Sequence, residues 1–310
     1  MAKRARNVLL LVKIETVVGT DPVPTPALNA MHAKVTSIQP TVAEFAERGN
    51  VRAYFGSGGQ VQVSNHSEID FEIELAGAGA AGTAPAYASL LKACGMAETI
   101  VAATSAVYKP ETDSTDTCTV YYYLDGLLHK LTSARGSVTF ELNARSIPML
   151  KFRMLGLYTI VADATMPTGA VYSGFKTPLA INKINTPTWG IHGATGAMQS
   201  LSVDLGNVVS YRNLIGYEGV VLSDRKTVGQ ASLEMVAVAT KAWHEAVRLG
   251  TLGAIQLIHG SVAGAIIQID GPKVQLTNPQ YAESDGVQML NVGLDFQPDT
   301  GDDEFVLTVK

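Results

Sequence analysis

The sequence contains very little cysteine, which excludes a disulfide framework and a thiolate metal site. Cys94 and Cys118 are the only cysteines among 310 residues. Two thiols do not make a disulfide-stapled scaffold, and neither has a second Cys or a His at the spacing of zinc ligands. We therefore expect a chain that folds in a reducing cytoplasm.

Charged residues are also scarce, and they do not form a basic patch. Asp, Glu, Lys and Arg together make up 16% of the chain, and the net charge is −5. A protein that grips DNA by its phosphates needs clustered Lys and Arg, and the only basic run is Lys3, Arg4 and Arg6. A surface with little charge is typical of a protein covered in part by neighbouring subunits.

No apolar run is long enough for a membrane helix, which needs ~18 apolar residues. The run VLLLV at 8–12 could pass for a signal-peptide core, but Lys13 and Glu15 interrupt it and no small-residue cleavage site follows. We interpret residues 8–14 as a strand and expect no membrane partner.

Motifs for catalysis or metal binding are missing or incomplete. There is no G-x-S-x-G elbow. His244-Glu245 begins an H-E-x-x-H zinc motif, but Arg248 occupies the second ligand position. The acidic residues near the end are Asp299, Asp302, Asp303 and Glu304. They could offer oxygen ligands to calcium, although their spacing is not that of an EF-hand and a solvated loop is the alternative. We expect no catalytic residue, no metal and no cofactor.

A glycine-rich loop has the motif of a dinucleotide-binding site. Gly77, Gly79 and Gly82 form a G-x-G-x-x-G between an expected strand and a short helix, as in dinucleotide-binding proteins. The strand before it, however, has one fully acidic face, whereas a Rossmann strand is buried on both faces. Hairpins rather than βαβ units follow. A nucleotide-binding enzyme therefore stays the alternative to a loop without a ligand.

What the sequence does contain is strong β patterning. Residues 68–75, EIDFEIEL, alternate strictly between apolar and acidic side chains. The apolar face is Ile69, Phe71, Ile73 and Leu75, and the acidic face is Glu68, Asp70, Glu72 and Glu74. The acidic face predicts either the solvated side of an antiparallel sheet or the lining of a pore through which DNA slides without binding. In the second half, Glu234 is the one acid on the matching face.

The same order of elements occurs twice. Each half has paired strands, an alternating strand, a short helix (Pro85 to Cys94, then about Thr240 to Leu249), an Asp-Gly hairpin and a long final strand. The hairpin turns are placed at Asp125-Gly126 and Asp270-Gly271. The other expected strands are 137–142, 149–158, 198–215, 219–225, 229–238, 254–259, 265–270, 287–296 and the terminal EFVLTVK.

We interpret this order as an internal duplication in a mainly β (α+β) protein. A prior of roughly 150 residues per domain also gives two domains. The segment 163–188, with Pro167, Pro178 and Pro187, is the expected linker. The first domain is then 1–162 and the second is 189–310, each a β-sandwich or barrel-like unit with one packed helix.

The proline-rich segment 19–30 is expected to be an extended loop or arm. Pro22, Pro24 and Pro26 follow Asp21 within six positions, and such spacing excludes a helix or a central strand. Long ordered loops usually have a role, and in an assembling protein that role is commonly contact with a neighbour.

Five stretches of the chain carry a resemblance to a known family. They are KIETVVGTDPVPTPALNA, EIELAGAGAAGTAPAYASLLKACG, YYYLDGLLHKLTSARGSVTFELNA, QSLSVDLGNVVSYRNLIG and DGPKVQLTNPQYAESDG. In them the chain resembles the major tail tube proteins of phages with long non-contractile tails. The stretches are spread over the chain from Lys13 to Gly286.

The resemblance implies a structural virion protein, assembled in the host bacterial cytoplasm, whose stacked rings form a tube for DNA passage. Its implied partners are further copies of itself, the tail tip or tape-measure proteins and the tail terminator. Many members have one domain and form hexameric rings, so a duplicated chain predicts rings of three chains with six pseudo-equivalent domains. Loops 15–31 and 76–84, together with the C-terminal strand, are the expected contacts between rings. Another tail structural or decoration protein is the alternative.

Overall fold

The computed structural model describes residues 3–310, so the first two residues of the expected first domain lie outside it. Within this range the chain forms nineteen strands and three short helices. Seventeen strands join one large antiparallel sheet, and two form a separate hairpin. The prediction of a mainly β protein is confirmed.

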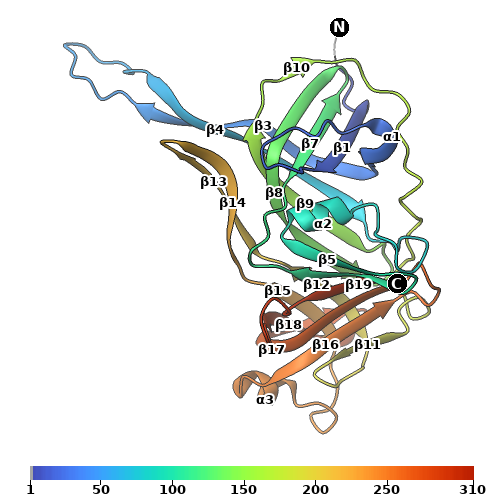
Figure 1. Ribbon diagram of the computed structural model, residues 1–310. Coiled ribbons are helices and arrows are strands. Elements are labelled where there is room, and N and C mark those ends of the chain that lie inside the picture. The colour runs from blue at the N-terminus through green and yellow to red at the C-terminus, as the bar shows by residue number, and fades with distance from the viewer. Residues whose placement is uncertain (1–2) are drawn as a thin grey trace.

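Ten strands lie before the linker (Figure 1). They are β1 (Val8–Ile14), β2 (Ala30–Met31), β3 (Ala33–Glu47), β4 (Gln60–Glu74), β5 (Met96–Val101), β6 (Ser105–Pro110), β7 (Cys118–Leu124), β8 (Leu127–Asn143), β9 (Met149–Tyr158) and β10 (Ala162–Asp163). Six of them lie side by side in the order β1-β7-β8-β9-β4-β3.

Nine strands follow. They are β11 (Thr188–Ile191), β12 (Met198–Asp204), β13 (Asn207–Leu214), β14 (Tyr217–Arg225), β15 (Val228–Glu234), β16 (Leu252–His259), β17 (Ile267–Ser284), β18 (Val287–Gln297) and β19 (Val306–Val309). Six of them lie side by side in the order β11-β16-β17-β18-β15-β12. The expected strand 198–215 is thus two strands, and the expected strand 229–238 ends at Glu234.

Two strand pairs connect the two groups. Residues 106–108 of β6 pair with 307–309 of β19. Residues 139–143 of β8 pair with 200–204 of β12. An uninterrupted run of eight strands results, in the order β3-β4-β9-β8-β12-β15-β18-β17.

The alternation in β4 places its apolar side chains in the core, as expected. Ile69, Phe71 and Ile73 are each 1% exposed. They belong to the same core cluster as Leu90 and Leu91 of helix α2 (Ala88–Ala93), which lies over this side of the sheet (Figure 1). The strand and its buried face were therefore correctly predicted from period-two alternation.

The two predicted hairpin turns have opposite outcomes. Asp125 and Gly126 have φ values of 43° and 90° and join β7 to β8, which confirms the first turn. The turn at Asp270-Gly271 is wrong, because β17 runs straight through both residues. Gly271 instead gives room to the Phe296 ring, which a Cβ would approach within 2.7 Å.

The turn of this second hairpin lies further along the chain. Asp285 and Gly286, with φ values of 54° and 78°, join β17 to β18. The exposed Pro272 is tolerated inside β17 because the pairing with β16 shifts register there, between Gly253 and Ile255.

The helices are shorter than expected, and one was not predicted. α2 covers the middle of the segment assigned to Pro85–Cys94, and α3 (Trp243–Arg248) that of 240–249. Helix α1 (Pro26–Asn29) lies in the segment from which a helix was excluded. That exclusion was wrong because Pro26 stands at the start of the helix, where proline's missing N–H is not needed.

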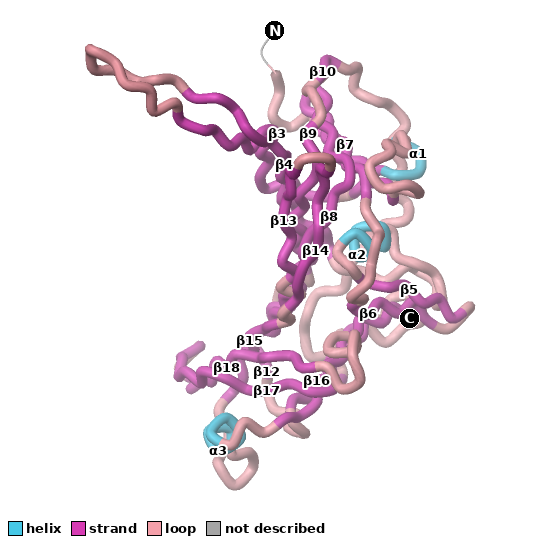
Figure 2. Tube along the Cα trace, turned by 60° about the vertical axis from the view of Figure 1, so that its left-hand side comes forward, coloured by secondary structure: helices cyan, strands magenta, loops and turns pink. Residues whose placement is uncertain are grey.

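The longest projection of the fold is a hairpin that the sequence did not indicate. β3 and β4 continue beyond the sheet. Residues 41–66, called the arm below, form a hairpin that has its base at His66 and projects away from the body (Figures 1 and 2). The hairpin β13–β14 occupies the corresponding place between β12 and β15, but it lies back along β8 and β9 (Figure 2).

The expected linker is irregular. Between β10 and β11, residues 164–187 contain no helix or strand. No helix within residues 3–310 combines the length and apolar character needed to cross a membrane.

Candidate assembly surfaces

The side of the eight-strand run that faces away from the core, called the polar face below, carries the predicted acidic residues. Glu68, Asp70, Glu72 and Glu74 alternate with the buried side chains of β4 and are partly exposed. Neighbouring strands add cations beside them: Lys34 pairs with Glu72 at 3.2 Å, and Arg153 pairs with Glu68 at 3.1 Å. The strand is wholly acidic on this side, as predicted, but the sheet is not.

Acids are still in excess on the polar face. Register places on it the carboxylates of Glu68, Asp70, Glu72, Glu74, Glu141, Asp204, Glu234 and Asp295. The cations that pair with members of this set are Lys34, Lys151, Arg153 and Lys226. The second half carries fewer acids, since Gln230 and Ser232 stand in line with Glu234.

Asp70 is a partly buried acid in the middle of the acidic side of β4. Burial raises the pKa of this carboxyl, and the nearby charge of Glu68 raises it further, against the opposing effect of Arg153. Its Oδ1 atom is buried and has no hydrogen-bond partner within residues 3–310. It lines a shallow depression together with Ser137 and Asn207, where the second half meets the first.

The run of eight strands ends in two free edges. β3 pairs only with β4, and residues 280–284 of β17 pair only with β18, among the described residues. Tyr281 on the second edge is 64% exposed. Unpaired N–H and C=O groups on an edge strand are open to pairing with another chain.

The hairpin β13–β14 is held on the first half by a defined set of contacts. The Nδ2 of Asn207 donates to the carbonyl oxygens of Cys94 at 2.7 Å and Gly136 at 2.9 Å. The backbone N–H of Asn207 donates to Ser137 Oγ at 3.2 Å. We call Cys94, Gly95, Gly136 and Ser137 the hairpin-binding site.

Two side chains of the hairpin complete this contact. Leu222 covers Gly95, where a Cβ would lie 3.0 Å from its Cδ1 atom. The Tyr211 ring stacks on His66 at the base of the arm, with 5.0 Å between ring centroids.

The proline-rich segment does not project as an arm. Asp21 accepts hydrogen bonds from the Tyr121 hydroxyl, from Lys130 Nζ at 3.2 Å and from the Val23 N–H at 2.9 Å. Burial opposes ionisation of Asp21, but these hydrogen bonds outweigh it and lower its pKa. Pro22 is fixed through its carbonyl by Lys13 Nζ at 2.8 Å, and Pro24 is buried. The segment therefore lies against β7 and β8.

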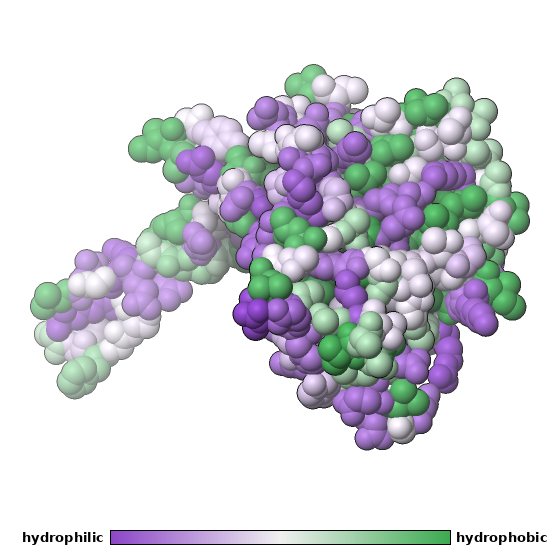
Figure 3. Space-filling view, turned by 90° about the horizontal axis from the view of Figure 1, so that it is seen from below, coloured by the Kyte–Doolittle hydropathy of each residue, from purple (hydrophilic) through white to green (hydrophobic). Residues whose placement is uncertain are grey.

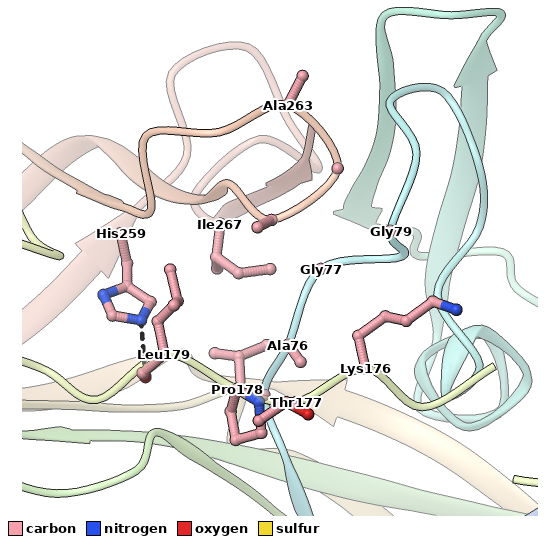
Figure 4. A pocket seen from close by; sticks show the side chains of 13 residues that line it. Ala76, Gly77, Gly79, Lys176, Thr177, Pro178, Leu179, His259, Ala263 and Ile267 are labelled. Carbon is pink, nitrogen blue, oxygen red and sulfur yellow. Dashed lines mark hydrogen bonds between the residues drawn. The ribbon is translucent and has the colours of Figure 1, made fainter. Parts of the chain in front are cut away.

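The glycine loop contacts the second half of its own chain. Gly79 N–H donates to Gly264 O at 2.7 Å, and a Cβ on Gly77 would lie 2.2 Å from that same oxygen. A Cβ on Gly82 would lie 2.3 Å from Ala103 N. Figure 4 shows the small pocket beside the loop, with Lys176 and His259 at its rim.

This packing accounts for the glycines without a nucleotide. They allow backbone to approach backbone, and the strand before the loop is antiparallel to both neighbours, unlike a Rossmann strand. Gly77, Gly79 and Gly82 were also expected to contact another ring, and that role stays a prediction.

The acidic C-terminal loop is tied to β14 by an arginine. Arg225 Nε donates to Glu304 at 2.6 Å and its NH2 to Asp302 at 2.9 Å. Asp303 accepts hydrogen bonds from Thr300, which lower its pKa to about 2. These carboxylates thus accept hydrogen bonds from side chains and backbone of the chain itself.

Sequence reasoning missed three features of the sheet and its hairpins: the free edge of β3, the arm and the hairpin-binding site. Pro40 interrupts β3, and the arm lies in solvent on both sides, so neither has the alternation that revealed residues 68–75. The Asn207 contacts join residues far apart in the chain, for which the sequence holds no local signal.

Comparison with known families gives one match. A family model described as "Phage tail tube protein" matches residues 5–298. The comparison with curated proteins returned no match. The family match includes both halves of the eight-strand run and both of its free edges.

Proposed function

The chain belongs to the phage tail tube protein family, and from this premise we propose that it builds the tube as rings of three chains with two copies of one tube domain in each. Members of the family are structural, non-enzymatic components of the virion and self-assemble into the tail tube. The number of chains per ring and the duplication are our proposals.

The matching strand orders support the duplication. β1-β7-β8-β9-β4-β3 and β11-β16-β17-β18-β15-β12 place corresponding elements at corresponding positions. The helices also correspond: along the chain, α2 follows β4 and α3 follows β15, and these two strands occupy the same position in the two orders.

A hydrogen bond at the base of each hairpin supports the same alignment. Ser67 Oγ donates to Pro40 O at 2.7 Å, and Thr227 Oγ1 donates to Leu205 O at 3.3 Å. Both donors are 2% exposed. We keep the proposed boundaries at 1–162 for the first domain, 163–188 for the linker and 189–310 for the second domain.

The observation that carries the ring is the β8–β12 junction. It joins the last strand of one four-strand group to the first strand of the next, with Phe140 opposite Val203 and Leu142 opposite Leu201. The free edges of β17 and β3 are the corresponding strands, so the same junction can form between chains. Under the alignment above, Tyr281 then lies opposite Ile38 of the next chain, and repetition closes a barrel.

The polar face would line the lumen of this barrel. Its acidic excess repels the phosphates of passing DNA, so that the duplex moves without specific binding. Glu68, Asp70, Glu72, Glu74 and Glu234 are the residues we assign to this lining. A long non-contractile tail is the proposed setting, with the tail tip or tape-measure proteins and the tail terminator as partners.

Contacts between successive rings are proposed for two surface loops. The proline-rich segment, from Asp21 through Pro22, Pro24 and Pro26, exposes Val23 and Leu28, which are 61% and 85% exposed. The loop of Gly77, Gly79 and Gly82 is the second candidate.

Cryo-electron microscopy of assembled protein tests the proposal. We expect hollow tubes whose rings contain three chains, with six four-strand groups around the lumen. Rings of six chains would refute the three-chain ring. Protein that only coats other particles and forms no tube would favour a decoration protein instead.

A further inference from the structure

We propose that the arm, residues 41–66, binds the second half of the neighbouring chain in the same ring, on a surface that corresponds to the hairpin-binding site. The inference rests on the proposed ring of duplicated domains. It adds a second intersubunit contact, separate from the pairing of the free edges.

The chain itself contains one example of this contact. The hairpin of the second half, β13–β14, lies on the strands β8 and β9 of the first half. These two halves are joined through the β8–β12 junction. In the proposed ring, each hairpin therefore lies next to the domain that pairs with the edge strand at its base.

The alignment locates the corresponding residues. Asn207 follows Leu205 by two positions, as Val42 follows Pro40, and Leu205 and Pro40 accept the matching hydrogen bonds at the hairpin bases. Val42 is thus the arm residue at the place of Asn207.

The receiving surface follows from strand register. Gly136 lies opposite Met154, which lies opposite Ile69. Leu276 lies opposite Leu294, which lies opposite Gly229. Ile69 and Gly229 each stand two residues after the aligned hydroxyl donors Ser67 and Thr227. Thr277 therefore corresponds to Ser137.

The corresponding site on the second half is uncovered. Cys94 and Gly95, at the end of α2, are buried, and Leu222 covers Gly95. At the end of α3, by contrast, Leu249 is 60% exposed beside Gly250, and Leu252 is 44% exposed. An apolar surface is thus exposed where its counterpart is covered.

The arm has the complementary chemistry. Phe45, Val61 and Val63 are 55%, 54% and 54% exposed, although they stand on paired strands. Burying such side chains against Leu249 and Leu252 removes apolar surface from water on both partners.

The arm's own second half is out of reach. The arm leaves β3 at one end of the eight-strand run, and the uncovered site adjoins β17 at the other end. Figure 3 shows the arm pointing away from the rest of the molecule. In a ring, the β17 strand that lies beside β3 belongs to another chain. The occupant of the uncovered site is therefore the arm of a second copy of this chain.

Disulfide trapping with Val42→Cys and Thr277→Cys in one chain tests the inference. The native Cys94 and Cys118 are both 0% exposed, so they do not compete. Under a mild thiol oxidant such as diamide, assembled protein should lose its monomer band on non-reducing gels. The covalent products should extend to three chains and stop there, because a closed ring has no further partner.

Two further pairs serve as matched controls. Asn207→Cys with Ser137→Cys should crosslink within one chain and leave a monomer-sized product. Val42→Cys with Ser137→Cys should not crosslink, because the hairpin of the same chain already covers Ser137.

The possible outcomes separate this inference from the proposed function. Tubes of three-chain rings without the Val42–Thr277 crosslink would overturn the arm contact and leave the ring intact. Products that continue beyond the ring size would mean that the arm joins successive rings, which also overturns it. Products that stop at six chains would support the arm contact and refute the three-chain ring. Failure to form any ring would overturn both.

Discussion

At the scale of single residues, Glu15 is a buried carboxylate whose oxygens are satisfied by the chain. It is 6% exposed and accepts hydrogen bonds from Thr117 Oγ1 at 2.8 Å, Thr119 Oγ1 at 2.6 Å and the N–H groups of Ser133 and Gly19 at 2.7 Å each. These contacts fix the end of β1 and the start of the proline-rich segment to β7 and β8.

Glu15→Ala should lower the free energy of unfolding by about 3 kcal/mol, because several buried donors lose their acceptor. Urea denaturation of the unassembled protein measures this loss. Glu15→Gln, which keeps one acceptor oxygen, should lose less. A loss below about 1 kcal/mol for Glu15→Ala would mean that water replaces the carboxylate.

His259 makes stability depend on pH. Burial lowers its pKa below the ordinary value of 6.5, against the opposing effect of hydrogen bonds with the backbone of Leu179 and Asn185. Because the unfolded chain takes up a proton that the folded chain resists, the free energy of unfolding should fall as pH drops through 6.5 toward the lowered pKa.

Thermal unfolding of the unassembled protein between pH 7 and 5 measures this effect. His259→Gln should make the decline shallower, and the part that remains comes from His129 and His192, whose pKa values burial also lowers. The same change at the exposed His244 should leave the slope as it is. Equal slopes for the native chain and the His259 variant would contradict the assignment.

Single side chains were predicted well where alternation was strong, and poorly where partners come from other strands. The buried and polar sides of residues 68–75 followed from the sequence. The cations Lys34 and Arg153 that neutralise part of the acidic row belong to β3 and β9. Register between strands decides such pairs, and a single sequence does not contain it.

At the scale of elements, the free edge of β17 is the part of the fold most directly open to test. Its hairpin with β18 closes through the two-residue turn Asp285–Gly286. Residues flanking such a turn exchange hydrogen bonds, so alternation turns the N–H of Glu283 toward the free edge.

Glu283→Pro should therefore prevent tube formation, because proline removes an N–H that the next chain would use. The unfolding midpoint of the unassembled protein should change little, and Glu283→Ala should still assemble. Negative-stain microscopy and size-exclusion chromatography measure the two effects. Tubes formed by Glu283→Pro at the native rate would exclude β17 as a closing edge.

The elements themselves were predictable where one side is buried. Strands 8–14 and 149–158 were assigned with the bounds that β1 and β9 have. β3 was missed because Pro40 and polar residues break its pattern. The false turn at Asp270-Gly271 arose because a turn motif can also occur within a strand, where Gly271 makes room for Phe296.

At the scale of the whole molecule, the continuous sheet determines how the two halves act together. The order of elements along the chain indicated two similar halves. It did not indicate that β8 and β12 would pair and merge them into one surface, because that pairing lies across the irregular segment 164–187. The polar face consequently extends across both halves. β4 in the first half carries four of its acids, whereas β15 in the second half carries Glu234 alone.

The β8–β12 junction has a consequence for the kinetics of ring formation. Since both strands belong to one polypeptide, this contact forms during folding at an effective concentration that dilution does not change. In the proposed ring of three chains, three of the six contacts between domains lie within a chain and form without an encounter between two molecules. The rate of nucleation should thus rise with a lower power of protein concentration than it would if every domain were a separate chain.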